Sequence, residues 1–357
     1  MAYTTIDDPS VYFQTALWTG DNGNLSVTND GNSDLKPDWI WAKRRDGTGN
    51  HVLADSTRGG DAHLRSNITD AESQFGGLDF TFATDGFTSS GSTLNESSRT
   101  HVAWQWKANG GTTTTNDASS TGVGTIDSVY QANTTAGFSI VTYTGTGSDC
   151  TIAHGLGSVP QWIIVKCRNE ATTSWRIYHV SNGNTNALKL DSQNAAFSAT
   201  ENWNSTTPTS TVFSLGTNEN VNGSADTFVA YCFAEKQGYS KFGSYIANNS
   251  TDGPFVYLGF KPAWIMIKNT SAASDFPIAD TKREVGNPFA QEILFANVSD
   301  AETSYANGVD FLSNGFKVRS TGSNGVFNAN NTSHKFIYMA FAESPFVSSK
   351  GVPCTAR

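Results

Sequence analysis

Apolar residues occur along this chain in short runs of successive positions, not at the spacing of a helix face. The runs "WIWAK" (39–43), "WIIVK" (162–166) and "WIMIK" (264–268) each begin with four consecutive apolar residues, and each has a proline two positions before its tryptophan. A strand that is covered on both faces has this pattern, and proline is tolerated at the first residue of a strand. The pattern predicts three equivalent buried strands, each followed by a lysine that marks where the strand leaves the core.

A second set of apolar runs repeats downstream of these strands in the same order. The segments "HVAWQWKA" (101–108), "FVAYCFAEK" (228–236) and "FIYMAFAES" (336–344) align Trp104 with Tyr231 and Met339, and Trp106 with Phe233 and Phe341. Ordered landmarks that recur along a chain indicate a repeated structural unit. We expect the aromatic residues at the repeated positions to form the structural core: Trp39, Trp162, Trp264, Trp104, Tyr231, Trp106, Phe233 and Phe341.

Turn signals between the runs favour an all-β fold. "ATDGF" (83–87) and "LSNGF" (312–316) carry Asp-Gly and Asn-Gly, which are strong hairpin signals, and "DSVYQAN" with "TTAGFSIVTY" predicts another hairpin. We therefore predict three tandem antiparallel β-sandwich repeats of jelly-roll or lectin-like type at 1–106, 125–237 and 238–357. Each is expected to have a separate interior lined by its tryptophan-led strand.

The segment 107–124, "KANGGTTTTNDASSTGVG", is poor in apolar residues and rich in Gly, Thr and Ser. This composition predicts a flexible linker between the first two repeats. No such segment separates the second and third repeats. We expect those two to be tightly apposed and the first repeat to be more independent.

Composition and charge exclude several classes of protein. Of 357 residues, 37% are hydrophobic and only 15% are charged, and the formal net charge is −9. A negative chain is unsuited to nucleic acid, and no apolar run reaches the roughly 20 residues that span a bilayer. The start "MAYTTIDDPS" has no basic or apolar region typical of a secretory signal. Cys150, Cys167, Cys232 and Cys354 are widely spaced and are interpreted as free thiols.

The strings "AGFSIVTYTGTG" (136–147), "HGLGSVPQWIIVK" (154–166), "FVAYCFAEKQGYSKFGSY" (228–245) and "FKPAWIMIK" (260–268) resemble a repeated domain of unknown function. That domain occurs in structural proteins of tailed bacteriophages, especially marine phages and cyanophages. The resemblance covers nearly the whole chain and implies a virion component, of the tail or its fibres, made in the host cytoplasm. It brings no catalytic motif with it.

The residues themselves indicate no catalytic, metal or cofactor site. The six histidines lack metal-binding spacing, and no serine lies in a nucleophile elbow. The Asp-x-x-Arg pairs Asp55–Arg58 and Asp280–Arg283 could supply a carboxylate for acid–base work, but a local salt bridge closing a turn is favoured.

Two further carboxylate pairs, Asp70 with Glu72 and Asp300 with Glu302, provide too few ligands for calcium by themselves. Among the histidines, His51 is interpreted as a packing residue, because it takes the place of Trp175 and Phe276 in the other copies. His154 is expected to hydrogen-bond within its own turn.

One aromatic residue is a candidate for an exposed ligand contact. Trp203 lies in the polar stretch "TENWNSTTPTS" (200–210) and has no counterpart in the other repeats, although a buried loop anchor is the favoured interpretation. The expected function is a non-enzymatic virion protein of a tail fibre, tail tip or collar. It would bind other virion proteins and itself, with a trimer as the guessed stoichiometry, and its loops would contact host glycans. A capsid decoration or head fibre, and a glycan-cleaving tailspike, remain as alternatives.

Overall fold

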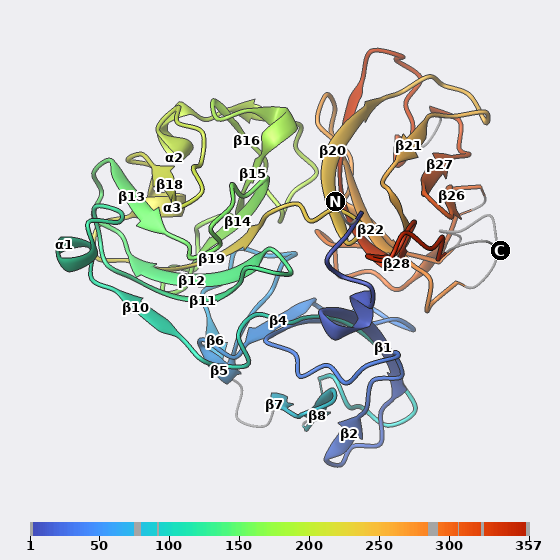
Figure 1. The fold of residues 1–357 in the computed structure, drawn as a ribbon, viewed down its shortest axis with the longest axis horizontal. Coiled ribbons are helices and arrows are strands. Elements are labelled where there is room, and N and C mark those ends of the chain that lie inside the picture. Colours follow the sequence, from blue (N-terminus) through green and yellow to red (C-terminus); the bar gives the residue numbers. More distant parts are fainter. Residues whose placement is uncertain are drawn as a thin grey trace.

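Antiparallel strands form nearly all of the regular structure in the computed structural model, which describes residues 3–74, 80–90, 93–284, 292–305, 307–322 and 325–354 (Figure 1). Its helices are single turns: α1 (Ala118–Thr121), α2 (Thr200–Trp203), α3 (Glu219–Asn222) and the 3-10 turns η1 (Pro9–Val11) and η2 (Val180–Asn182). The predicted all-β class is confirmed. Among the described residues, no helix has the length and apolar character needed to cross a bilayer.

Three large sheets of six strands have corresponding strand orders. The first contains, in order, β1 (Phe13–Thr19), β9 (Thr100–Trp106), β3 (Trp39–Arg44), β4 (Val52–Asp55), β5 (Gly59–Leu64) and β6 (Ser73–Gln74). The third contains β20 (Ser240–Ile246), β28 (Lys335–Pro345), β22 (Phe260–Asn269), β23 (Pro277–Asp280), β24 (Glu292–Phe295) and β25 (Thr303–Ser304).

The second large sheet follows the same order over four strands and then extends further at one edge. It contains β10 (Thr114–Asn116), β11 (Ser128–Asn133), β12 (Phe138–Thr144), β19 (Thr227–Phe233), β14 (Trp162–Cys167) and β15 (Arg176–His179). The strands β12, β19, β14 and β15 correspond to β1, β9, β3 and β4 of the first sheet. The hairpin of β10 and β11 adds two strands beyond β12 that the other two large sheets lack.

Smaller sheets accompany each large one. They are β2 (Leu25–Val27), β8 (Phe87–Ser89) and β7 (Phe80–Phe82); β13 (Cys150–Ala153) with β18 (Val212–Leu215) and β16 (Asn186–Ala187) with β17 (Phe197–Ser198); and β21 (Phe255–Tyr257), β27 (Gly315–Val318) and β26 (Val309–Leu312). The hairpins predicted from the turn residues are confirmed as β7–β8, β26–β27 and β11–β12.

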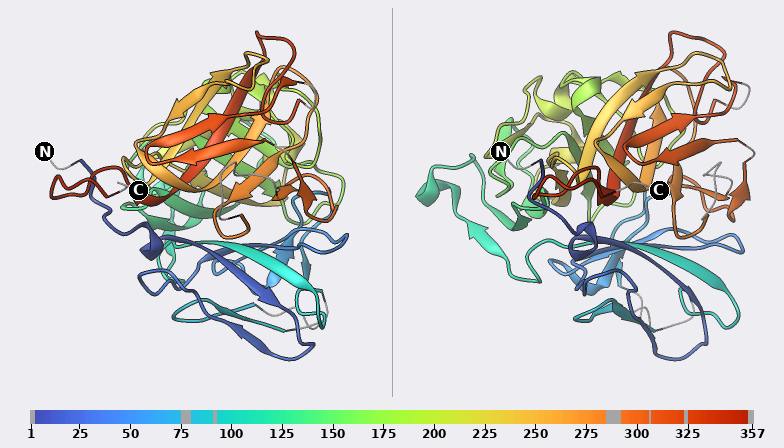
Figure 2. Two further views of the ribbon diagram at one scale, coloured as in Figure 1. Left: turned by 90° about the vertical axis from the view of Figure 1, so that its right-hand side faces the viewer. Right: turned by 45° about the vertical axis from the view of Figure 1, so that its right-hand side comes forward.

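The three large sheets surround a common centre, with the blue, green and orange parts of the chain forming a triangle (Figure 1). Two further views show the first sheet below the other two (Figure 2). Each tryptophan-led strand is buried on both faces because one face meets its own small sheet and the other meets this centre. In β3, Ile40 and Ala42 belong to a local core, whereas Trp39 and Trp41 belong to a central cluster.

The central cluster contains all eight aromatic residues expected to be structural, and each of them is at most 1% exposed. They were expected to line three separate interiors, and that expectation is wrong. The Trp106 ring lies 4.5 Å from Trp39, 5.7 Å from Trp264 and 6.4 Å from Phe233, so it contacts rings of all three large sheets. The separate interiors exist, but mainly smaller residues line them.

The lysines at the ends of the tryptophan-led strands do not leave the core, contrary to the prediction. Lys43, Lys166 and Lys268 are each 0% exposed. Strand alternation places each of them on the face that carries the tryptophan, and carbonyl oxygens accept hydrogen bonds from their ammonium groups. Lys166 Nζ donates to Thr69 O of the first sheet region at 3.0 Å, and Lys268 Nζ donates to Gln193 O of the second at 2.9 Å.

Residues 107–124 were expected to be a flexible linker, and the structure corrects this. They contain β10 and α1, and the side chains of Asp38 and Gln131 hold the segment before β10. Asp38 Oδ2 accepts hydrogen bonds from the backbone N–H groups of Ala108 and Gly110, each at 2.8 Å. Polar residues form this segment because an edge strand and a capped turn need few apolar side chains. The first sheet is accordingly not independent of the others.

Replacing Asp38 with alanine should release this segment. Two backbone N–H groups would lose a charged acceptor, which costs about 1–3 kcal/mol when the groups stay buried. We expect faster proteolytic cleavage within 107–113 and a lower free energy of unfolding. Limited proteolysis with mass-spectrometric mapping measures this, and unchanged cleavage there would show that Asp38 does not order the segment.

Candidate functional site

A network of buried charges joins the second large sheet to the first. Tyr231 Oη of β19 donates to Asp55 Oδ2 at 2.9 Å, and Arg58 Nε contacts the same oxygen at 2.6 Å. Arg58 Nη1 lies 2.6 Å from Glu72 Oε2, and Arg168 Nη2 lies 2.8 Å from Glu72 Oε1. The side chains of Asp55 and Arg58 are 0% exposed. The predicted local salt bridge is present, but it is buried at a contact between sheets.

The same arrangement joins the first large sheet to the third. Trp104 Nε1 of β9 donates to Asp280 Oδ2 at 2.9 Å, and Arg283 Nε contacts that oxygen at 2.6 Å. Arg283 Nη1 and Arg45 Nη2 each lie 2.8 Å from a carboxylate oxygen of Glu302. Each residue corresponds to one in the first network, so the two contacts have equivalent partners.

The third contact, between the third and second large sheets, keeps the geometry without the Asp–Arg–Glu ion network. Ala196 N donates to Thr270 O at 2.9 Å, as Glu72 N donates to Arg168 O and Glu302 N to Arg45 O in the other two contacts. The positions that carry Asp55 and Tyr231 in the first network are His179 and Met339 here. The three large sheets therefore close into a ring, with two contacts that carry this ion network and one, called the neutral contact below, whose corresponding positions carry no ion pair.

Burial and neighbouring charges shift the pKa values of the buried charged groups. Burial alone would raise the pKa of Glu72, but hydrogen bonds from Arg168 and the charge of Arg58 hold it below its usual value. Burial lowers the pKa of Lys43 and Lys166 to about 8 and that of Lys268 to about 7. Lys166 and Lys268 are occupied in hydrogen bonds between sheets, and Lys43 Nζ donates to Arg44 O and Gly47 O beside its own strand, so we assign all three a structural role.

Five of the six histidines, His51, His63, His101, His154 and His179, are buried, and burial lowers the pKa of each so that they are neutral at pH 7. His51 Nδ1 accepts a hydrogen bond from Trp41 Nε1 at 2.9 Å, in agreement with its interpretation as a packing residue. His154 Nδ1 accepts from Leu156 N at 3.2 Å within its own turn, as expected. Burial lowers the pKa to about 3 for His51 and His179, and to about 4 for His63, His101 and His154.

Acidification from pH 7 to pH 5 should therefore destabilise the protein. Below about pH 6.5 the histidines of the unfolded chain bind protons, whereas the folded chain excludes those protons until its lowered pKa values are reached. Each such group removes about 1.4 kcal/mol of stability per pH unit. Urea unfolding measured at both pH values tests this, and a His154→Gln variant should show a shallower pH dependence. Equal stability at the two pH values would contradict the assignment of neutral histidines.

Trp203 is not a surface contact. Its ring is 1% exposed, its Nε1 donates to Asn186 O at 3.1 Å, and Tyr178 packs against it at 5.8 Å. It belongs to the local core between the second large sheet and its small sheets. The prediction of an exposed ligand contact is therefore wrong, and the favoured interpretation, a buried loop anchor, is confirmed. All four cysteines are free, three buried and Cys354 exposed, as interpreted from the sequence.

Three of the four carboxylates weighed as calcium ligands form ion pairs instead. Glu72 and Glu302 belong to the networks above, and Asp70 lies 3.2 Å from Arg65. Within the described ranges, no three side chains of His, Cys, Asp or Glu come together as a metal-binding group.

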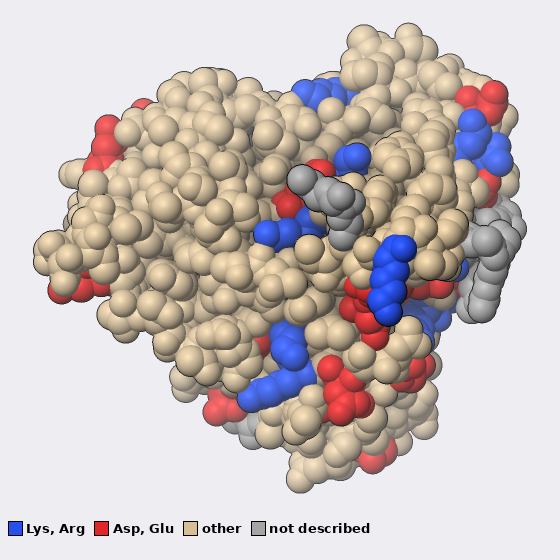
Figure 3. Space-filling view, viewed as in Figure 1, with Lys and Arg blue, Asp and Glu red and all other residues tan. Residues whose placement is uncertain are grey.

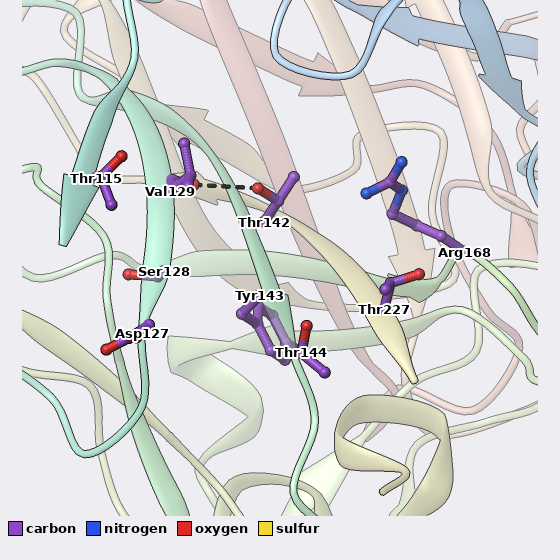
Figure 4. A pocket seen from close by; sticks show the side chains of 9 residues that line it. All are labelled: Thr115, Asp127, Ser128, Val129, Thr142, Tyr143, Thr144, Arg168 and Thr227. Atoms are coloured by element: carbon purple, nitrogen blue, oxygen red, sulfur yellow. Dashed lines mark hydrogen bonds between the residues drawn. The ribbon is translucent and has the colours of Figure 1, made fainter. Parts of the chain in front are cut away.

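An open trough of about 420 Å³ lies on the second large sheet, and sequence reasoning did not find it. It crosses the strands, with Thr115 on β10, Val129 on β11, Thr142 on β12 and Thr227 on β19 (Figure 4). Arg168 lines it on the side of β14. One lining residue, Asp127, carries a carboxylate, so the lining lacks the carboxylate pair that a glycan-cleaving enzyme would need.

Charged side chains are sparse on the face of the molecule seen in Figure 3, and the part formed by the second sheet shows fewest. A family model described as a domain of unknown function, DUF7483, matches residues 8–345. The match spans all three large sheets, and the chain belongs to this family. A search of curated proteins finds no match.

Proposed function

We propose that this member of the DUF7483 family is a non-enzymatic structural protein of a tailed-phage virion, in a tail fibre, tail tip or collar. The observation that carries the proposal is the closed arrangement of three large sheets around the central cluster. Such an arrangement gives a rigid block, because its parts cannot move without exposing buried tryptophans and separating buried charges.

We further propose that the three large sheets, with their small sheets, are three copies of one β-sandwich unit. The support for this is the corresponding strand order of the three large sheets and the equivalent partners at the three contacts. The resemblance of "HGLGSVPQWIIVK" and "FKPAWIMIK" to phage structural domains supports the placement in a virion. In that role the block would assemble with other virion proteins and with further copies of itself.

The position of the chain in the particle tests the proposal. A reconstruction of the phage that encodes it, or gold labelling of an epitope-tagged copy, should place it on the tail. Labelling only on the head would favour the decoration or head-fibre alternative. Absence from purified particles would overturn the proposal, and release of reducing sugars from host polysaccharide would replace it with the tailspike alternative.

A further inference from the structure

The trough on the second large sheet continues the face that packs against the first sheet. Phe138 and Ile140 of β12 lie in the central cluster, and Thr142 and Thr144 follow them on the same face, beyond that cluster. Thr144 is exposed and pairs with Thr227 of β19. The trough is therefore a polar extension of a face whose other half is a tightly packed core.

The added hairpin makes this trough specific to the second sheet. In the first sheet Leu17 and Thr19 occupy the positions of Thr142 and Thr144, but the sheet ends at their strand, β1. In the second sheet β11 and β10 continue beyond β12 and bring Thr115 and Asp127 to the far side. The segment 107–124 thus forms part of one side of the trough, and this side has no counterpart in the other two large sheets.

Several polar groups along the trough keep hydrogen-bonding capacity. Arg168 donates hydrogen bonds from Nε and Nη2 to Glu72, at 2.9 and 2.8 Å, and these bonds fix the position of its guanidinium group. Its Nη1 makes no hydrogen bond within the described residues. One Asp127 oxygen accepts Ala118 N at 2.9 Å, and the other is available. The hydroxyl groups of Thr115 and Thr144 have no partner among the described residues.

The chemistry of this lining indicates a ligand rich in hydroxyl groups. One arginine is too few for a nucleic acid backbone, and a lipid chain would leave the threonine hydroxyls, the Asp127 oxygen and the guanidinium without partners. A peptide strand would need a free sheet edge, whereas the floor here is a sheet face with paired backbone groups. Neighbouring strands lie about 4.8 Å apart, close to the length of one sugar ring, so the paired hydroxyls of Thr144 on β12 and Thr227 on β19 match successive sugars, while β11 contributes Val129 to the floor.

We propose that the trough binds an oligosaccharide lying across β10, β11, β12 and β19. Arg168 would donate to sugar oxygens at one end, Asp127 would accept from sugar hydroxyls at the other, and the threonines would contact the middle. This inference rests on and deepens the proposed virion function, because it gives the host-glycan contact expected from the sequence a ligand class and a site. The binding itself does not depend on where the protein sits in a particle.

Binding is tested with the purified full chain on a broad array of neutral and uronate-containing oligosaccharides, followed by titration calorimetry with the best hexamer. The double variant Thr142→Ala, Thr144→Ala removes two floor hydroxyls at partly or fully exposed positions. We expect it to weaken binding at least about tenfold, the loss expected for one or two hydrogen bonds. Thermal melting should stay nearly unchanged, because the core is untouched and the double variant loses one long hydrogen bond, from Thr142 Oγ1 to Val129 O at 3.4 Å.

The matched control is Thr19→Ala, which removes the equivalent threonine from the first sheet and should bind like the wild type. Equal affinity of the Thr142→Ala, Thr144→Ala variant and the wild type would overturn the inference, as would an array without a hexamer bound more tightly than about 1 mM. Neither result would affect the virion proposal, which depends on location. Conversely, binding by a protein absent from particles would leave the inference standing and remove the virion role.

Discussion

Replacing Trp106 with alanine is expected to destabilise the whole chain by about 3–5 kcal/mol, the range for truncating a large buried aromatic residue. Trp106 is 1% exposed, and its ring contacts Trp39 of the first sheet, Phe233 of the second and Phe341 of the third, the last at 5.6 Å. A cavity at this position removes packing from all three sheets together. Denaturant unfolding gives the free energy, and hydrogen exchange locates the loss.

The matched control is Phe213→Ala. Phe213 is also buried, at 0% exposed, but it lies in the local core between the second large sheet and its small sheets. Its loss of stability should be similar in size, with faster exchange concentrated between residues 114 and 233. In the Trp106 variant, exchange should accelerate in β3, β14 and β22 alike. Acceleration confined to residues 13–106 would show that the sheets do not share their stability.

Replacing Arg58 with asparagine should cost about 3–5 kcal/mol, because Asp55 and Glu72 would each lose a buried cationic partner. Arg58 and Asp55 have side chains that are 0% exposed, so water cannot take over the lost interaction without a rearrangement. Asparagine is the residue that the chain itself carries at the corresponding position of the neutral contact, Asn182. Denaturant unfolding at neutral pH measures the loss.

The neutral contact also suggests the rescue. Adding Asp55→His, Glu72→Ala and Tyr231→Met to Arg58→Asn removes the stranded carboxylates and copies the corresponding residues His179, Ala196 and Met339. Arg168 then loses Glu72, but its side chain is 26% exposed, so water can hydrate it. Since a neutral packed replacement of a buried ion network is often near neutral in stability, the fourfold variant should be more stable than Arg58→Asn alone. If the fourfold variant is instead less stable than Arg58→Asn alone, the cost of leaving Asp55 and Glu72 buried without Arg58 does not explain the loss of stability.

The sequence predicted the strands and turns because their signals are local. Four successive apolar residues after Pro37, Pro160 or Pro262 are sufficient to indicate a buried strand, and Asn-Gly or Asp-Gly pairs mark the hairpins. The shared centre was missed because burial on both faces does not tell what covers each face. A usable signal was present in β3, where Trp39 and Trp41 alternate with the smaller Ile40 and Ala42.

The partners across sheets could not be predicted for a different reason. Asp55 and Arg58 are close in sequence, so their ion pair was expected, but Tyr231 and Arg168 come from strands more than a hundred residues away. The lysines were misassigned because a charged side chain after an apolar run usually leaves the core, whereas here carbonyl oxygens of a neighbouring sheet region bind Lys166 and Lys268. The trough was missed because β10 contains only the polar residues "TTN".

Differential scanning calorimetry of the intact chain tests most directly whether the three large sheets share one core. A shared centre predicts a single cooperative transition with equal calorimetric and van 't Hoff enthalpies, although a chain of 357 residues exceeds the usual two-state size. Two or three separable transitions, each assignable to one large sheet, would contradict the account.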